Sequence, residues 1–336
     1  MTDQHSDVRV GIIGAGGIFP VHADAWRSLG VEIVVFSTDG KQHDAAAGFG
    51  ARGVDTLDEL LDAVDVVDIC TPTLSHPDLV EQAAAASKHV VCEKPLAITS
   101  AEAERLAEVC AAAGVQLHVA HVVRYFAEYA AAQQAVASGR LGELAVQRFS
   151  RGSARPTRGW FADPKQSGGI LMDQMIHDID FARWTAGEVV EVFARQTGRM
   201  DDQTDTIAAH CLLTHASGAI SQCSGVWGHR GYPFQTSFSL AGSDGQLQHD
   251  STEHQPLKVD AAPLADGSVI PATPFVESPY LTEIAEFHQA ILGGPTPRVT
   301  PQDAIAAVRL AEAAAQSMAS GQPVRIESAT STRSHA

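Results

Sequence analysis

The sequence predicts an α/β protein of two domains: an N-terminal doubly wound parallel sheet and a C-terminal α+β domain with a large, mostly antiparallel open sheet. Three observations support this prediction. The chain has 336 residues, more than the roughly 100–200 residues of a typical single domain. Short apolar runs alternate with helical patterns as far as about residue 120, and a series of β-like runs with thin turns follows. The predicted domains are residues 1–122 and 123–336.

In the first domain, strand-like runs are apolar throughout, which is typical of strands that are buried on both faces of a parallel sheet. Helical patterns lie between them. In the helix predicted at 99–113, Thr99 and Glu102 fit a capping box, and Gly114 ends the pattern. The predicted strands are residues 8–13, 31–36, 64–70, 88–92 and 115–121.

The second domain begins with one helix and continues mainly as strands. Turns rich in Gly, Asp and Ser separate the later strands, which indicates hairpins. A helix at 169–185 interrupts the series, and two amphipathic helices, 282–292 and 301–320, close the chain. The predicted strands are residues 144–149, 189–195, 207–213, 219–225 and 235–240.

Charge and cysteine content exclude several classes of protein. The 40 acidic residues against 23 Lys and Arg leave a net charge of −17, so no broad surface for nucleic acid or an anionic membrane is expected. No run approaches the ~20 apolar residues of a membrane span, and no secretion signal is evident. The five cysteines are scattered and form no CxxC pair, which predicts reduced thiols in the cytoplasm and no metal site.

A glycine-rich turn follows the first strand. Gly14 permits a tight turn, and Gly16 lets the backbone approach a pyrophosphate that would lie over the helix N-terminus. Gly17 and Ile18 complete the turn, and Phe19 stands where the fingerprint has a third glycine. Because the turn lies at the first strand–helix junction of an alternating series, it predicts a dinucleotide site rather than a plain turn.

The end of the second strand bears on the choice between NAD and NADP. NAD sites usually carry an acid here to hold the ribose hydroxyls, whereas this strand ends in Ser37-Thr38-Asp39, with Lys41 nearby. The two hydroxyls and Lys41 can accept a 2′-phosphate, while Asp39 can reach back to the ribose. We expect NAD or NADP, with a slight preference for NADP; an ordinary strand exit is the alternative.

Glu93-Lys94-Pro95 follows the strand at 88–92, at the edge where a doubly wound sheet binds its ligands. Pro95 restricts the residue before it to an extended or turned backbone. A lysine in this place can hydrogen-bond a substrate hydroxyl or shuttle its proton. A surface salt bridge between Glu93 and Lys94 is the alternative.

The helix at 169–185 carries Asp173 and His177, which are four residues apart and therefore share one helix face. A histidine among apolar neighbours, with a carboxylate one turn away, makes a good general base. A satisfied core histidine is one alternative. A metal site is another, although no third ligand with useful spacing is evident.

A basic segment precedes this helix and contains Arg151, Arg155 and Arg158, followed by Trp160. The arginines can hydrogen-bond sugar hydroxyls or a phosphate, and Trp160 can stack on a sugar face. An exposed loop without a ligand is the alternative.

Together these segments resemble the Gfo/Idh/MocA oxidoreductases. The resemblance covers nearly the whole chain and rests on GIIGAGGI with His22, on CEKPLA and on SGGILMDQMIHDID. It implies a Rossmann domain followed by an α/β domain with a large open sheet. It also implies NAD(P)-linked oxidation or reduction of a sugar, a cyclitol or a related polyol.

The resemblance also assigns residues to roles. The implied catalytic residues are Lys94, Asp173 and His177. The residues that match cofactor-lining positions are Thr71, Pro72, His76, Glu93 and Lys94. The candidate substrate contacts are Arg124, Arg151, Trp160, Asp173 and His177.

Two alternatives to a dehydrogenase stay open at this point. Some relatives of the family are NAD-dependent glycosidases that oxidise their substrate transiently, and a non-catalytic NAD(P)-binding sensor is the other alternative. An open sheet with one uncovered face further predicts a homodimer or homotetramer.

Overall fold

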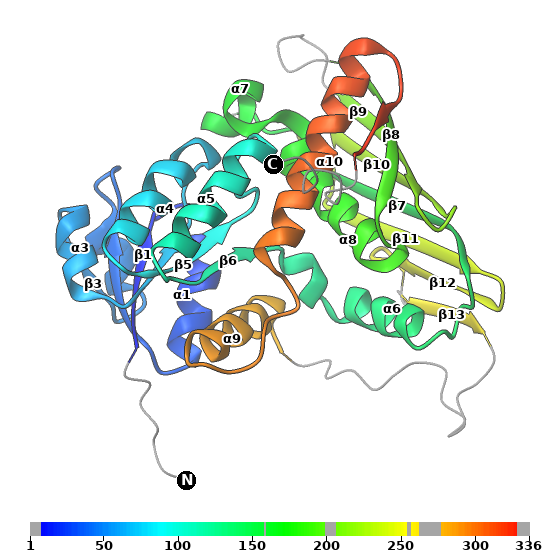
Figure 1. Ribbon diagram of the computed structural model, residues 1–336. Helices are drawn as coiled ribbons and strands as arrows, with labels where there is room; N and C mark the ends of the chain where they lie inside the picture. The colour runs from blue at the N-terminus through cyan, green and yellow to red at the C-terminus, as the bar shows by residue number, and fades with distance from the viewer. Residues whose placement is uncertain (1–7, 158, 199–205, 254–256, 262–276, 328–336) are drawn as a thin grey trace, which may run out of the picture. The chain divides into compact units, whose positions relative to one another are not determined.

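The computed structural model describes residues 8–157, 159–198, 206–253, 257–261 and 277–327. The chain divides into two compact units (Figure 1). Unit 1 comprises Met1–Phe126 and Phe275–Ile305, and unit 2 comprises Ala127–Pro274 and Ala306–Ala336. Among the described residues, no helix is long and apolar enough to cross a membrane.

Unit 1 is built on a six-stranded parallel sheet in the order β3-β2-β1-β4-β5-β6. The strand order reverses between β1 and β4, as in a doubly wound sheet. The predicted parallel sheet is therefore confirmed, and only the two-residue β3 was not predicted. The strands are β1 (Arg9–Ile13), β2 (Glu32–Phe36), β3 (Arg52–Gly53), β4 (Val66–Ile69), β5 (His89–Glu93) and β6 (Leu117–Ala120).

Helices cover both faces of this sheet (Figure 1). Val67 and Ile69 of β4 point into the core on one face, and Val66 points into the core on the other. This explains why the strands are apolar throughout. One face carries α3 (Leu57–Ala63), α4 (His76–Ala85) and α5 (Ser100–Ala112), and the other carries α1 (Phe19–Ser28) and α9 (Pro279–Ile291). The short elements are α2 (Gln42–Ala47), η1 (Thr73–Ser75) and η2 (Val122–Tyr125).

Helix α9 belongs to unit 1 although it comes late in the chain. Its Ile284 and Phe287 are fully buried in the same core as β1 and α1. The ring of His288 packs edge-on against Trp26 of α1, with ring centroids 5.9 Å apart. The apolar face of α9 thus completes the helical layer that α1 begins.

The division of the chain differs from the predicted one at two places. The first segment of unit 1 ends at Phe126 rather than at residue 122, and residues 275–305 return to unit 1 instead of belonging to the second part. The amphipathic pattern at 282–292 shows that the helix has an apolar face. It does not show which of two sheets that face covers.

Unit 2 contains an eight-stranded sheet in the order β13-β12-β11-β7-β10-β9-β8-β14. Strands β7 and β10 pair in parallel, and the other neighbours pair antiparallel. The predicted mostly antiparallel sheet is confirmed, whereas its last three strands were not predicted. The strands are β7 (Leu144–Ala154), β8 (Val189–Thr197), β9 (Ile207–His215), β10 (Ile220–Gly228), β11 (Gln235–Gly242), β12 (Gly245–Asp250), β13 (Leu257–Ala261) and β14 (Val324–Arg325).

Helices lie along one face of this sheet (Figure 1). On that face, Phe149 of β7 packs against Phe181, with ring centroids 5.8 Å apart, and Phe181 packs against Phe238 of β11 at 6.1 Å. The helices of unit 2 are α6 (Ala127–Ala137), η3 (Gly159–Ala162), α7 (Pro164–Ser167), the π-helix η4 (Leu171–Met175), α8 (Ile176–Ala186) and α10 (Pro301–Ser320), whose first turn belongs to unit 1.

The opposite face of the same sheet carries polar side chains over β7, β10 and β11, with exposed apolar side chains at Leu212 and Ile220. It holds a cavity of about 420 Å³ over β7, β10 and β11. Its polar lining includes Arg148, Ser150, Gln222, Ser224, Ser237 and Ser239.

We expect Phe287→Ala to destabilise unit 1 by about 3–5 kcal/mol, because a fully buried ring leaves a cavity when it is removed. Urea unfolding followed by circular dichroism measures the change. Leu292→Ala is the control, since this side chain directly follows the same helix and is 53% exposed. Its effect should stay within about 0.5 kcal/mol. Equal effects of the two substitutions would contradict the role of α9 in the core.

Candidate functional site

The predicted cofactor residues of unit 1 gather at the carboxyl ends of its parallel strands. Gly14 follows β1, Ser37 follows β2, Thr71 comes just after β4, and Lys94 follows β5. Ligands of doubly wound sheets bind outside the carboxyl ends of the strands, where the strand order reverses. In this unit the reversal lies between β1 and β4, so these residues share the edge at which doubly wound sheets bind dinucleotides.

The glycine turn is built to bring the backbone close to a ligand. Gly14 has φ +103°, and its N–H donates to the carbonyl of Phe36 at 2.8 Å. A Cβ at this position would lie 2.6 Å from the carbonyl oxygen of Cys70, so only glycine fits. A Cβ at Gly16 or Gly17 would meet nothing within 4 Å, so these two residues border open space.

Helix α1 starts directly after this turn, with Ile18 at the N-cap and no side chain capping the first turn. Pro20 in the first turn has no N–H, and the Val21 N–H donates to the carbonyl of Ile18 at 3.2 Å, so the N–H groups that can face an anion are those of the turn itself and of Phe19. Phe19, in the place of the third fingerprint glycine, is buried and packs edge-on against Phe49 at 5.4 Å between ring centroids. The missing glycine is thus replaced by a packing residue, and the turn before it stays intact.

Asp39 organises the end of β2. Its carboxylate accepts hydrogen bonds from the Ser37 hydroxyl at 2.7 Å and from the Lys41 backbone N–H at 3.2 Å, and it pairs with the Lys41 ammonium. The hydrogen bonds from Lys41 and Ser37 lower the pKa of Asp39 to about 2. Thr38 is exposed beside them. Ser37 and Lys41, two of the groups predicted to accept a 2′-phosphate, therefore already contact the carboxylate of Asp39.

His76 connects the loop after β4 to the turn after β5. Its Nδ1 lies 2.9 Å from the carbonyl oxygen of Pro95, and its Nε2 lies 3.0 Å from that of Thr71. Burial lowers the pKa of His76, so the ring is neutral and one of these nitrogens donates. The Ser75 hydroxyl bonds to Thr71 Oγ1 at 2.8 Å and to the carbonyl of Pro72 at 2.7 Å. Thr71, Pro72 and His76 thus stiffen this part of the edge.

Lys94 is half-buried at the carboxyl end of β5 and is joined to Pro95 by a cis peptide bond. The Oε2 of Glu93 accepts the Lys94 backbone N–H at 2.9 Å, and its Oε1 lies 3.2 Å from His22 Nε2. Although burial opposes the charged form, the hydrogen bond and charge of His22 hold the pKa of Glu93 below its ordinary value. Glu93 is therefore a buried support of the turn rather than one half of a surface salt bridge.

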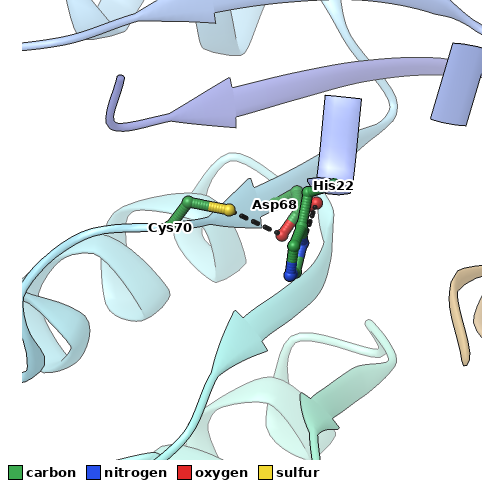
Figure 2. A group of neighbouring side chains, drawn as sticks. All are labelled: His22, Asp68 and Cys70. Carbon is green, nitrogen blue, oxygen red and sulfur yellow. Dashed lines mark hydrogen bonds and ion pairs between the residues drawn. The ribbon is translucent and has the colours of Figure 1, made fainter. Parts of the chain in front are cut away.

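A buried polar group behind Glu93 was not predicted from the sequence. His22 Nδ1 lies 2.9 Å from Asp68 Oδ2, and the Trp26 indole N–H donates to the same oxygen at 2.8 Å. Figure 2 shows the carboxylate of Asp68 between the ring of His22 and the sulfur of Cys70. One signal was present in the sequence: Asp68 interrupts an apolar strand, where a buried carboxylate needs hydrogen-bond partners.

Among the described residues, His22, Asp68 and Cys70 place possible metal-binding atoms within 4.8 Å of one another. Their surroundings favour hydrogen bonds over a metal ion. Burial and the charge of Asp68 raise the pKa of Cys70 to about 12, and the thiol lies 3.6 Å from Asp68 Oδ1 as a hydrogen-bond donor. Both ring nitrogens of His22 already face carboxylate oxygens. A metal ion bound by these residues would have to replace the hydrogen bonds that His22 makes to Asp68 and Glu93.

In unit 2, the Asp-His segment is a π-helix, Leu171–Met175, that continues as α8. Such π turns are rare and are frequent at functional sites. Within residues 170–182, Asp173 and His177 are only partly buried, whereas every other side chain is buried. The two side chains therefore share the accessible side of this segment, in agreement with their predicted placement.

Arg124 and Arg151, the two arginines predicted to contact substrate, make other contacts. Arg151 lies on the inward side of β7, which extends beyond its predicted end, and it binds both carboxylate oxygens of Asp178 at 2.8 and 3.1 Å. Arg124 is fully buried, donates to the carbonyl of Arg298 at 2.9 Å and pairs with Asp303 at 3.3 Å. Both guanidinium groups hold elements of their own unit together. Their hydrogen bonds and ion pairs are with groups of the protein.

Trp160 lies in η3, where its ring stacks on Phe161 with centroids 3.8 Å apart. Phe161 is 40% exposed, so the pair presents an aromatic surface. The backbone N–H of Arg155 donates to Gly228 at 2.9 Å, at the end of the sheet. Arg158 lies outside the described residues.

Two family models match consecutive parts of the chain. Residues 8–121 match an oxidoreductase family with an NAD-binding Rossmann fold, and residues 129–248 match the GFO/IDH/MocA C-terminal domain. The chain belongs to the Gfo/Idh/MocA oxidoreductase family. This confirms the family inferred from the motifs and makes the protein an NAD(P)-dependent oxidoreductase.

Members of the Gfo/Idh/MocA family match the chain over nearly its full length. Inositol 2-dehydrogenase of Rhizobium meliloti (strain 1021) is 32% identical over 335 residues, which cover 95% of this chain and 99% of that protein. Myo-inositol 2-dehydrogenase of Thermotoga maritima is 30% identical with the same coverage. The crystal structure of GenD2 from gentamicin A biosynthesis in complex with NAD superposes with a TM-score of 0.82 at 26% identity, covering 98% of this chain and 100% of that chain.

The turn of this Gfo/Idh/MocA protein fits the pyrophosphate of a dinucleotide. Open space over Gly16 and Gly17 and the uncapped start of α1 provide room and backbone N–H groups for an anion. No basic side chain is needed at this point, which agrees with the acidic composition of the chain.

Substitution of the two glycines separates the folding role of the turn from its binding role. Gly14→Ala should destabilise the protein by at least ~1–2 kcal/mol because of its positive φ and the close carbonyl of Cys70. Gly16→Ala should leave the free energy of unfolding within about 0.5 kcal/mol yet weaken cofactor binding, since the new methyl group occupies the space over the turn. Urea unfolding and a fluorescence titration with NADH and NADPH measure the two effects. Unchanged binding in Gly16→Ala would show that the phosphates lie elsewhere.

Proposed function

We propose that this enzyme is a dehydrogenase of an inositol, a sugar or a related polyol, moving a hydride between a carbinol carbon and a nicotinamide cofactor. The observation that carries the proposal is the pair Asp173 and His177, which are partly exposed in an otherwise buried segment. The names of the two inositol dehydrogenases, at 32% and 30% identity, support the substrate class.

Three side chains would carry the proton chemistry. His177 takes the proton of the substrate hydroxyl, and Asp173, four residues before it, holds the ring in the productive tautomer and stabilises the imidazolium. The Lys94 ammonium stabilises the developing alkoxide. When bound, NAD(P) supplies the nicotinamide carbon that accepts the hydride.

The stacked rings of Trp160 and Phe161 suit the apolar face of a sugar or cyclitol ring. Polyols present C–H groups on a ring face and hydroxyls at the rim. An aromatic surface therefore binds the face while hydrogen-bonding groups orient the rim. We assign this pair to substrate binding in place of the two buried arginines.

A dehydrogenase is preferred to the two alternatives, the glycosidase and the sensor. A sensor needs neither the lysine nor the histidine, yet Lys94 and His177 are both present. A glycosidase would release a leaving group with no net change in nicotinamide absorbance, whereas a dehydrogenase produces one reduced cofactor per substrate oxidised. The absorbance assay below therefore also decides between them.

The choice of cofactor depends on Asp39. Ser37, Thr38 and Lys41 favour NADP slightly when the sequence is considered alone. The contacts of Asp39 favour NAD, since its carboxylate would repel a 2′-phosphate and can accept the ribose hydroxyls, and the Lys41 ammonium is already paired. We propose NAD as the preferred cofactor and Asp39 as the residue that discriminates.

Association with further copies of the chain stays a proposal. It is supported by the long sheet of unit 2, one face of which carries no described helix, and a homodimer or homotetramer would cover that face. The compartment is also proposed. All five cysteines are free and buried, which suits the reducing cytoplasm.

Lys94→Ala and His177→Ala should each lower kcat by at least ~10²-fold, the usual contribution of one proton-transfer group. The Kd of the cofactor should change little in His177→Ala, whose side chain lies in unit 2, and less than kcat in Lys94→Ala, because the glycine turn that receives the phosphates stays intact. The assay follows nicotinamide absorbance with a panel of inositols, aldoses and sugar acids and both cofactors.

Lys88→Ala is the matched control, since Lys88 directly precedes the opposite end of the same strand β5. It should keep the kcat of the unsubstituted enzyme. Turnover near that of the unsubstituted enzyme in Lys94→Ala or His177→Ala would refute the assigned roles.

Asp39→Ser should raise the ratio of kcat/KM with NADP to kcat/KM with NAD by about 10- to 100-fold, because it removes a repelling charge and a ribose acceptor. Asp44→Ser, an exposed acid on the neighbouring helix α2, makes the same change of charge. Its ratio should stay that of the unsubstituted enzyme. Equal ratios in the two variants would remove Asp39 from the choice of cofactor.

A further inference from the structure

We propose that His22 is a positioning residue for Lys94, because it links Asp68 to Glu93 in a buried hydrogen-bonded chain that fixes the backbone at Lys94. The inference rests on the role proposed for Lys94 above.

The chain of contacts runs from the middle of the sheet to its carboxyl edge. Asp68 of β4 lies 2.9 Å from His22 Nδ1, and His22 Nε2 lies 3.2 Å from Glu93 Oε1. The other oxygen of Glu93 accepts the Lys94 N–H at 2.9 Å. His22 and Asp68 are fully buried, and Glu93 is 8% exposed. Each link is therefore shielded from water, which would otherwise compete for it.

His22 acts in this chain as an imidazolium. Both ring nitrogens face carboxylate oxygens, and a neutral ring has only one N–H to donate. Burial opposes the charge, but the carboxylate of Asp68 raises the pKa of His22 well above its ordinary value. The cation is held between two anions, so both links are charge-assisted hydrogen bonds.

The other groups around His22 are neutral. Burial and the negative charge of Glu93 raise the pKa of Glu283 on α9 well above its ordinary value, and neither oxygen of Glu283 has a hydrogen-bond partner. The Cys70 thiol and the phenol of Tyr280, whose ring lies 6.3 Å from that of His22, also stay protonated. Besides His22, Lys94 is the other cation whose charge acts on Glu93. His22 is thus the one buried cation that compensates both Asp68 and Glu93 in the described part of unit 1.

Loss of the hydrogen bond from His22 to Glu93 would act on Lys94 through Glu93. A buried carboxylate that loses its partner is costly, so Glu93 would take up a proton or move toward water. Either change weakens its hold on the Lys94 N–H. A displacement of about 1 Å at a catalytic group is enough to lower turnover by up to about 10²-fold.

Two amides test the two links separately. In His22→Asn, the amide nitrogen reaches the place of Nδ1 and keeps the bond to Asp68 but loses the bond to Glu93. In His22→Gln, the amide nitrogen reaches the place of Nε2 and keeps the bond to Glu93. We expect kcat to fall about 10- to 100-fold in the Asn variant and to stay within about 3-fold of the unsubstituted enzyme in the Gln variant. Substrate KM and cofactor Kd should change less than about 3-fold in both.

Trp26→Phe is the matched control. It removes a hydrogen bond to the same oxygen of Asp68 from the same helix, but it leaves the link to Glu93 intact. Its Tm should fall while its kcat stays unchanged. A purely structural His22 would instead give the Asn and Gln variants equal losses of Tm and equal kcat, and that result would overturn the inference.

Lys94→Ala, measured beside these variants, keeps the two proposals apart. If it retains turnover, the role of Lys94 and the inference built on it both fail. If it is inactive while His22→Asn keeps full kcat, only the role of His22 fails. One equivalent of bound metal in the purified enzyme, lost in Cys70→Ser, would show that His22, Asp68 and Cys70 form a metal site and would also overturn the chain.

Discussion

The register of β1 between β2 and β4 is the constraint on which the cofactor edge depends. The N–H of Gly14 continues the ladder to Phe36, and the N–H of Cys70 continues it to Ile13 at 2.9 Å on the other side. A shift of one residue in β4 would exchange the two faces of the strand. Asp68 would then enter the apolar core under α3, α4 and α5, away from His22 and Trp26. The same pairing thus sets the shape of the turn and the face on which the buried charges meet.

The parallel sheet was predictable because its strands are buried on both sides and therefore apolar throughout. The glycine turn was predictable for a different reason, since φ +103° at Gly14 leaves one residue type that fits. The shared, partly exposed side of Asp173 and His177 was predictable because two signals can be read from the sequence: the helical spacing of the pair and their polarity in an apolar segment. Each of these signals is local, so neighbouring residues reveal it.

The remaining features depend on contacts between distant residues. The sequence shows that Arg151 is basic but not that Asp178 lies opposite it, so a buried ion pair looks like a ligand-binding arginine. Phe19 breaks the glycine fingerprint, and only the ring of Phe49 explains why this is tolerated. Asp68 in an apolar strand indicates that a hydrogen-bond partner is buried nearby. It does not indicate that this partner is His22, which lies 46 residues earlier in the chain.

The return of α9 to unit 1 has a consequence for synthesis of the protein. A ribosome makes β1 to β6 first and then nearly the whole sheet of unit 2 before Ile284 and Phe287 emerge. Until then the nascent N-terminal half lacks one of the two helices on the α1 face of its sheet, and apolar core residues there stay open to water. N-terminal domains usually fold first during translation, but this one cannot be completed co-translationally before its C-terminal helix arrives. A truncated chain that ends after the last long strand would therefore expose the apolar core residues that α9 covers, and we expect chaperones to bind it.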